Sequence, residues 1–214
     1  MTRGPAFEPI DEVRRLTNFS TGDLGGRLAQ VLAEAGYRVI LFSGGLTTAP
    51  DPASDRVEAH RFDTNESLAA GLQSLAGSRQ VLALFHTAAL CDYRVRSLKT
   101  VSGAAVGKKK IASRAGNLIL ELEPARKVIS DLRDWYPNSR LVGWKYELEG
   151  ERPAAVQRAR DSIVKNRLDL GVINGAAFGG GYGLVTSDGA LKREEPDKDR
   201  LCSALVEWLA SSCG

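Results

Sequence analysis

The stretch LGGRLAQVLAEAGYRVILFSGG, residues 24–45, decides the fold. Its first half is typical of a helix with one buried face, because apolar residues recur at intervals of three and four. These residues are Leu24, Leu28, Val31, Leu32 and Ala35. Ser20 or Thr21 can cap this helix, and Gly36 ends it. Residues 38–42 then form a short β-rich run. The stretch therefore predicts a helix followed by a buried strand.

The same alternation continues along the chain. Further strands are expected at residues 57–62, 81–85, 118–122, 141–146, 170–173 and 183–186. Further helices are expected around residues 68–75, 125–132, 156–164 and 201–209. Alternating βα units favour a parallel sheet covered by helices. The sequence therefore predicts an α/β fold, a Rossmann-like three-layer sandwich with a mainly parallel central sheet flanked by helices.

Residues 1–214 are expected to form a single domain, because no linker or repeat divides them. The chain starts at what resembles the loop after a strand, so the first strand is expected to be very short, truncated or missing. Residues 94–116 and the glycine-rich residues 175–183 fit neither helix nor strand. Long connections in α/β domains often carry function, and ligands bind beyond the carboxyl ends of the strands.

Composition restricts the function classes. Apolar residues make up 43% of the chain and charged residues 26%, as in an ordinary globular protein. The net charge of +3 arises from mixed signs, which argues against nucleic-acid binding. Three cysteines without a CxxC pair, no signal-peptide pattern and no apolar run of about 20 residues favour a cytoplasmic protein without membrane contact.

The segment that precedes the first helix, residues 18–26, can receive an anion. Free N–H groups of the first helical turn point toward whatever lies there. The alternative is a helix cap in which Gly25 and Gly26 permit close packing. The spacing fits neither GxGxxG nor a P-loop, which argues against an NAD(P) oxidoreductase.

Polar residues follow the strand at 81–85. Asp92 can hold Mg²⁺ together with substrate phosphates, or it simply caps or pairs with Arg94. His86 is interpreted as structural and Cys91 as a small buried hydrophobe. The run Lys108-Lys109-Lys110 is either a solvated charge run or a loop that closes over a polyphosphate.

Six ordered motifs make the chain resemble the phosphopantothenoylcysteine synthetase family, the phosphopantothenate–cysteine ligases of coenzyme A biosynthesis. Residues 4–14 are similar to the family's G-G/P-T-x-E-P-I-D-x-V-R, and residues 16–22 to its I-T-N-x-S-S/T-G. The other four are residues 88–93 (A-A-V-A-D-Y/F), 108–110 (K-x-K-K), Gly143-Trp144 (G-F) and Ile173-Asn174 (the A-N of A-N-D).

The resemblance implies a reaction in two steps. CTP or ATP, with Mg²⁺, activates the phosphopantothenate carboxylate as an acyl-nucleotidylate, and the cysteine amine then displaces the nucleotide. It implies that Asn18 and Arg14 convert the intermediate and that Lys108, with Lys110 as a second candidate, lies over the triphosphate. Asp92 becomes the metal contact. The nucleotide site would comprise Ser20, Gly22, Ala88, Ala89, Asp92, Lys108, Lys110, Trp144, Lys165 and Asn174.

The chain also departs from the family pattern. Gly175 replaces the aspartate of A-N-D, and the flavin-binding decarboxylase domain fused to many members is absent, so no flavin is expected. Lys165 matches a family lysine only loosely. Because family members dimerise, the resemblance implies a homodimer. The loss of the aspartate keeps two alternatives open: a non-catalytic nucleotide-binding paralogue, or a ligase for another acid and amine.

Overall fold

The computed structural model describes residues 1–107, 109–112 and 116–211. Within these residues the body of the molecule is an eight-stranded sheet of order β12-β11-β10-β9-β6-β1-β4-β5. The strands are β1 (Thr2–Arg3), β4 (Val39–Gly44), β5 (Val57–Phe62), β6 (Ala83–His86), β9 (Arg140–Tyr146), β10 (Leu170–Asn174), β11 (Tyr182–Thr186) and β12 (Leu191–Glu195). The strands from β10 to β5 run parallel, and β11 and β12 are antiparallel additions. The expected mainly parallel sheet is confirmed.

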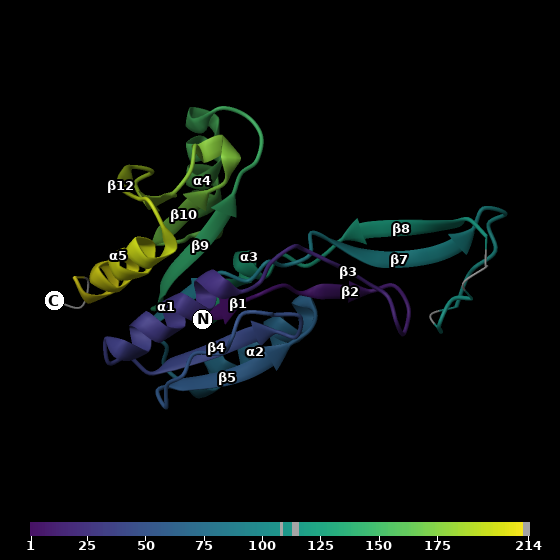
Figure 1. Ribbon diagram of the computed structural model, residues 1–214, viewed down its shortest axis with the longest axis horizontal. Helices are drawn as coiled ribbons and strands as arrows, with labels where there is room; N and C mark the ends of the chain where they lie inside the picture. Colours follow the sequence, from purple (N-terminus) through teal and green to yellow (C-terminus); the bar gives the residue numbers. More distant parts are fainter. Residues whose placement is uncertain (108, 113–115, 212–214) are drawn as a thin grey trace.

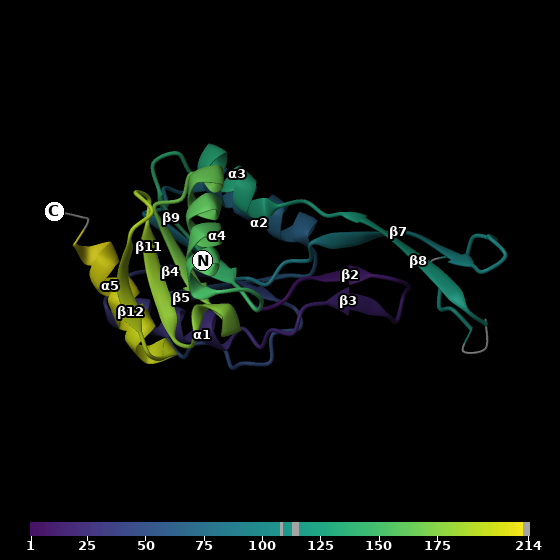
Figure 2. The same ribbon diagram turned by 90° about the horizontal axis from the view of Figure 1, so that it is seen from above.

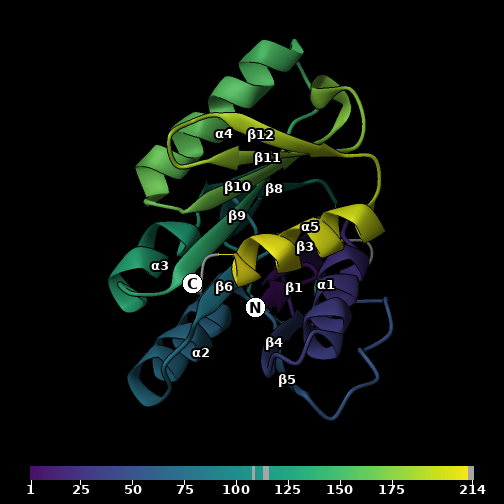
Figure 3. The ribbon, with the colours of Figure 1, turned by 90° about the vertical axis from the view of Figure 1, so that its left-hand side faces the viewer.

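Helices cover both faces of the sheet (Figure 3). They are α1 (Asp23–Glu34), α2 (Asn65–Ser78), α3 (Val128–Trp135), α4 (Arg152–Asn166) and α5 (Lys198–Ala210). Neighbouring residues of a strand point to opposite faces, so Leu141 packs with α2, α3 and α4, whereas Val142 packs with α1 and α5. The three-layer sandwich expected from the sequence is therefore confirmed. No helix in the described part of the chain combines the length and apolar character needed to cross a bilayer.

The first strand is present and very short. Thr2 and Arg3 form β1, which lies between β4 and β6 and is fully buried. Of the expected alternatives, a very short, truncated or missing first strand, the structure shows the very short one, two residues between β6 and β4. Because its two residues are a threonine and an arginine, no apolar run marks this strand in the sequence.

Two antiparallel ribbons project from the body, on the side away from α5 (Figures 1 and 2). One pairs β2 (Phe7–Pro9) with β3 (Arg15–Thr17), and the other pairs β7 (Tyr93–Thr100) with β8 (Leu118–Pro124). We call the β7–β8 ribbon the arm. It corrects two expectations: residues 118–122 form a strand outside the central sheet, and residues 94–116 contain a strand, β7. Charged and polar residues separate the apolar residues of β7 (YRVRSLKT), so no apolar run marks this strand.

Candidate functional site at the carboxyl edge of the sheet

The sheet reverses its winding between β1 and β6. From β1 the chain adds β4 and β5 on one side, and from β6 it adds β9 and β10 on the other. Ligands of open α/β sheets bind at such a point, beyond the carboxyl ends of the strands. Residues 4–6 and 87–92 follow β1 and β6 at this edge. Residues 18–22 contact both segments, because Asn18 donates to the Leu90 carbonyl and Gly22 approaches the Gly4 backbone. This edge is the candidate site.

The segment after β6 is held by hydrogen bonds to the residues that follow β1. The Ala89 N–H donates to the Gly4 carbonyl at 2.9 Å, and the Ala88 N–H donates to the Thr2 hydroxyl at 3.2 Å. The same hydroxyl lies 3.0 Å from Nδ1 of His86. Burial lowers the pKa of His86 to about 4, with a contribution from the N-terminal amine. The ring is therefore neutral at pH 7, which agrees with a structural role for His86.

Asn18 is positioned on this segment, whereas Arg14 is not. Nδ2 of Asn18 donates to the Leu90 carbonyl at 2.8 Å. Arg14 instead pairs with the buried Asp11 and donates to the Ile111 carbonyl at 3.4 Å from Nη2. Four residues of extended chain, about 13 Å, separate the two backbone positions. Asn18 thus lies at the candidate site, whereas Arg14 connects the β2–β3 ribbon to the segment between β7 and β8.

The start of α1 differs from the expected cap. The N-cap is Gly22, in the left-handed conformation with φ of 75°. The Thr21 hydroxyl accepts from the Asp23 N–H at 3.3 Å, and Ser20 is half-buried beside it. An added Cβ at Gly22 would lie 2.7 Å from Thr47 and 3.1 Å from the Gly4 backbone. Glycine is therefore required because the helix start touches the loop after β1.

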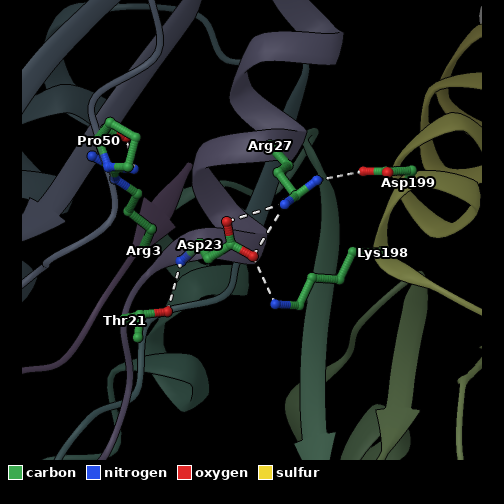
Figure 4. A network of polar contacts seen from close by, with 7 residues as sticks. All are labelled: Arg3, Thr21, Asp23, Arg27, Pro50, Lys198 and Asp199. Atoms are coloured by element: carbon green, nitrogen blue, oxygen red, sulfur yellow. Dashed lines mark hydrogen bonds and ion pairs between the residues drawn. The ribbon is translucent and has the colours of Figure 1, made fainter.

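A charged network lies next to this helix start (Figure 4). Asp23 accepts from Lys198 at 2.6 Å and from Arg27 at 3.1 Å, and Arg27 also donates to Asp199 at 2.8 Å. The hydrogen bond from Lys198 contributes most to lowering the pKa of Asp23. The first turn of α1 thus already carries a carboxylate, with two cations beside it.

Gly25 and Gly26 make room for Arg3, whose side chain is fully buried. A Cβ at Gly25 would lie 2.5 Å from Cβ of Arg3, and one at Gly26 would lie 2.5 Å from its Nη1. Arg3 donates to the Ser43 hydroxyl at 2.9 Å and the Pro50 carbonyl at 3.0 Å, and it pairs with Asp51. The close-packing interpretation of the two glycines is confirmed. Sequence reasoning missed Arg3, because a lone arginine carries no signal of burial.

A cavity of about 590 Å³ opens beside the end of β10. Its lining includes Tyr146, Asn174, Gly175, Tyr182, Arg27 and Lys198. Trp144 lies two residues before Tyr146, and its indole N–H is buried without a hydrogen-bond partner among the described residues. Of the two residues predicted for the nucleotide side, Asn174 lines the cavity, and Trp144 is on β9, two residues before the cavity residue Tyr146.

Gly175 lines this cavity in a backbone conformation that favours glycine. It has φ of 112°, and a Cβ there would lie 2.2 Å from the Glu147 carbonyl oxygen. The backbone conformation at residue 175 therefore excludes an aspartate, because no side chain fits this turn.

Lys165 does not reach the cavity. It lies in the last turn of α4, which leads into the start of β10, whereas the cavity is at the end of β10. Since α4 runs antiparallel to the strands, Lys165 belongs to the opposite edge of the sheet. The loose match of Lys165 to the family lysine, one residue out of register with the A-N-D motif, is consistent with this placement.

The remaining predicted residues are Asp92, which precedes β7, and the lysines of the segment between β7 and β8. Asp92 is exposed and pairs with Lys127, rather than with Arg94, which pairs with Glu123. Lys110 is exposed on the segment between β7 and β8, and Lys108 lies outside the described residues. No cluster of three or more His, Cys, Asp or Glu residues that could hold a metal occurs in the described ranges. Sequence reasoning also missed Phe19, an apolar ring next to Asn18 that is fully exposed.

Comparison with known proteins agrees with this arrangement. Residues 1–211 match the family model of the DNA/pantothenate metabolism flavoprotein C-terminal domain. The chain is 30% identical over 211 residues to the coenzyme A biosynthesis bifunctional protein CoaBC of Bacillus subtilis, covering 94% of this chain and 47% of that protein. It therefore spans about half the length of this relative.

Solved structures give the same result. The DNA/pantothenate metabolism flavoprotein from Streptococcus pneumoniae superposes with a TM-score of 0.85 at 25% identity, covering 99% of this chain and 97% of that one. A Cab2 mutant in complex with phosphopantothenate-cysteine superposes with a TM-score of 0.75 at 16% identity, covering 99% and 87%. This second likeness shows the fold. The chain belongs to the DNA/pantothenate metabolism flavoprotein C-terminal domain family.

Proposed function

We propose that this chain is a nucleotide-dependent ligase that joins 4′-phosphopantothenate to cysteine in coenzyme A biosynthesis. Its membership of the family and its likeness to CoaBC support this activity. The observation that carries the proposal is the hydrogen bond of 2.8 Å from Asn18 to the Leu90 carbonyl. This bond fixes the Asn18 amide beside Ala89 and Asp92 at the winding reversal of the sheet.

The Asn18 side chain is suited to the acyl-transfer step. An amide nitrogen carries two N–H groups, and the Leu90 carbonyl accepts only one of them. The second is free to donate to the acyl oxygen, where negative charge develops as the cysteine amine attacks. A donor that is already oriented stabilises such a transition state without reorganising. In this proposal Asn18 is the catalytic residue. Arg14 supports it indirectly, because its contact with the Ile111 carbonyl holds the β2–β3 ribbon that leads to Asn18.

The nucleotide would lie between the start of α1 and the cavity beside β10. Ser20, Gly22, Ala88 and Ala89 form the first part of this path, and Trp144 and Asn174 the second. Arg27 and Lys198 line the cavity, where they pair with Asp23 and Asp199, and in this proposal they exchange these partners for nucleotide phosphates. Lys108 and Lys110 would approach from the segment between β7 and β8, and we expect Lys108→Ala to weaken nucleotide binding in a titration. Either CTP or ATP can serve as the nucleotide in this proposal. We also propose that the protein acts in the cytoplasm.

Mg²⁺ fits this site through a single carboxylate. Asp92 is exposed, and one or two carboxylates together with substrate phosphates are the usual ligands of this ion. Asp92 would hold Mg²⁺ after exchanging its partner Lys127, and the bound ion would neutralise charge on the triphosphate.

We also propose that the chain works as a homodimer through the arm. Tyr93, Ile119 and Leu122 on the arm and Val13 beside it are all exposed by more than 40%. A two-stranded ribbon is marginal in water by itself, so a second copy is a fitting partner for this apolar surface. Light scattering of the purified chain tests the stoichiometry, and a monomer at all concentrations would contradict the dimer.

Pyrophosphate release tests the ligase. The purified chain is incubated with CTP or ATP, phosphopantothenate, cysteine and Mg²⁺, and we expect release that depends on phosphopantothenate. Omission of phosphopantothenate is the blank. Release no higher than this blank with every nucleotide would reject the ligase and favour the non-catalytic nucleotide-binding paralogue, which the missing aspartate at Gly175 suggests.

The role of Asn18 has its own test. In Asn18→Ala we expect nucleotide activation to continue, while amide formation falls by about 10²- to 10³-fold, the usual effect of losing one transition-state donor. Asn138→Ala is the matched control, because Asn138 is exposed at the amino edge of the sheet, just before β9. An Asn18→Ala variant that forms product at the parent rate would rule out the assigned role.

A further inference from the structure

The two strands of the arm leave and re-enter the body at one point. The chain runs outward at Leu90–Cys91–Asp92 into β7, and it returns from β8 through Ala125 and Arg126 to α3. The Ala125 N–H donates to the Asp92 carbonyl at 2.9 Å. We call residues 90–92 and 125–127 the arm root. Asp92 and the Leu90 carbonyl, to which Asn18 donates, both belong to this root.

Asn65, the first residue of α2, joins the two halves of the arm root. Its side chain is fully buried. Oδ1 accepts from the Cys91 N–H at 3.2 Å, and Nδ2 donates to the carbonyls of Cys91 at 2.8 Å and Arg126 at 3.0 Å. The amide orientation is determined by these partners, because a flipped amide would set donor against donor and acceptor against acceptor.

These bonds satisfy three backbone groups of the root, two at the buried Cys91 and one at Arg126, where the bond is partly buried. No other partner for the Cys91 N–H, the Cys91 carbonyl or the Arg126 carbonyl is found in the described part of the chain. A buried polar group without a partner is costly. Without the Asn65 amide, the chain at Cys91 would have to move to find new partners.

The groups held by Asn65 lie next to the groups that the proposed reaction uses. The Leu90 carbonyl, adjacent to Cys91, accepts from Asn18. Asp92, on the other side of Cys91, pairs with Lys127, which follows Arg126. We propose that Asn65 is a positioning residue that fixes the Leu90 carbonyl and Asp92, and through them the orientation in which Asn18 acts. The effect on turnover rests on the proposed function, whereas the effect on the arm root does not.

Hydrogen exchange of the full chain tests the positioning directly. In Asn65→Ala we expect faster exchange at residues 90–92 and 125–127, with little change in the helices. Asn166→Ala is the matched control: Asn166 is also buried and donates to the Ser162 carbonyl at 2.8 Å, but it lies at the end of α4. Exchange at the arm root that equals that of the parent chain would overturn the proposal, whether or not the chain is a ligase.

Turnover provides the second readout. We expect kcat for product formation to fall about 10- to 100-fold in Asn65→Ala, as small misplacements of reacting groups do. Asn166→Ala should keep the parent kcat. Asn65→Asp separates positioning from space filling, because it preserves the shape and the acceptor but removes both N–H donors. It should be no more active than Asn65→Ala, and recovery to the parent rate would overturn the proposal.

A milder variant covers loss of folding. If Asn65→Ala does not fold, Asn65→Ser retains one donor that can reach one carbonyl. It should show the same exchange pattern and a smaller fall in kcat, and parent behaviour in both measurements would overturn the proposal. An inactive parent chain would reject the ligase itself, and the exchange comparison would still decide the role of Asn65.

Discussion

Strands β9 and β8 share an apolar first half but have opposite surroundings. β9 reads RLVGWKY and β8 reads LILELEP, each with apolar residues in its first half. In β9, Leu141 and Val142 are almost completely buried, because helices cover both faces of the sheet. In β8, Ile119 is 51% exposed and Leu122 is 42% exposed. An apolar run therefore predicts a strand, but it does not predict which sheet receives it.

The charged residues of β8 explain its place. Glu121 pairs with Lys99 and Arg96, and Glu123 pairs with Arg94, all across the ribbon on β7. Ion pairs of this kind favour an exposed strand, since burying them carries a desolvation penalty. β9 places its charges at the ends, at Arg140 and Lys145, and so can enter a covered sheet. The distribution of charge along a strand thus carries information that its apolar content lacks.

The largest expected difference between body and arm is in stability. Leu141→Ala should lower the free energy of unfolding by about 2–5 kcal/mol, the cost of a cavity in a packed core. Ile119→Thr should change it by less than about 0.5 kcal/mol, because this side chain is half-exposed and threonine keeps the β-branch. Urea unfolding at a concentration where the chain is monomeric measures both. Equal losses in the two variants would mean that the arm is as well packed as the sheet.

The next effect compares two glycines with positive φ. Gly175→Ala should cost about 2–3 kcal/mol, from backbone strain and the contact of 2.2 Å with Glu147. Gly103→Ala is the control in the turn after β7: its φ is 90°, but nothing lies within 4 Å, so only the strain of about 1–2 kcal/mol remains. Thermal unfolding measures both. If Gly103→Ala is the more damaging variant, the close approach at Gly175 is not the reason for the glycine.

Much of the body could be predicted because its signals are local. The apolar spacing in α1 and the run at β4 identified both elements, and residues 57–62 matched the bounds of β5. The arm could not be placed, since its pairing depends on contacts between distant residues such as Val95 and Leu122. Local patterns do not report such partners.

The sequence likewise predicted some residues of the candidate site and missed others. The motif resemblance led to Asn18 and Asn174, which the structure places at the carboxyl edge. It gave no reason for the burial of Arg3 or for the bonds of Asn65, because both act on backbone groups brought close only by the fold. Side chains that support other segments have no spacing rule, so they appear only in three dimensions.

A smaller effect concerns the exposed apolar surface of the arm. Ile119→Lys should weaken dimer formation by about tenfold or more, equivalent to ~1.4 kcal/mol, because it places a charge in the proposed interface. Val164→Lys is the control, since Val164 is also exposed, by 70%, but lies on α4. Sedimentation equilibrium measures the dissociation constant. If Val164→Lys weakens the dimer and Ile119→Lys does not, the interface lies on the body.

The smallest expected effect is the pH dependence of the contact between the β2–β3 ribbon and the arm. Burial by itself raises the pKa of Asp11, but hydrogen bonds from the Ile111, Val13 and Arg14 N–H groups and from the Arg14 side chain outweigh it and lower the pKa to about 2. Because the folded pKa lies below the ordinary value of 3.8, the stabilisation is complete above about pH 4 and declines as the pH falls toward 2.

Asp11→Asn tests this contact. The asparagine can still accept from the Val13 and Arg14 N–H groups, but it loses the charge that faces Arg14. The difference in urea midpoint between parent and variant should therefore be constant from pH 7 to pH 4 and smaller at pH 3, where the unfolded parent chain has already taken up the proton. A difference that stays the same at pH 3 would show that the Asp11 carboxylate holds the arm by shape rather than by charge.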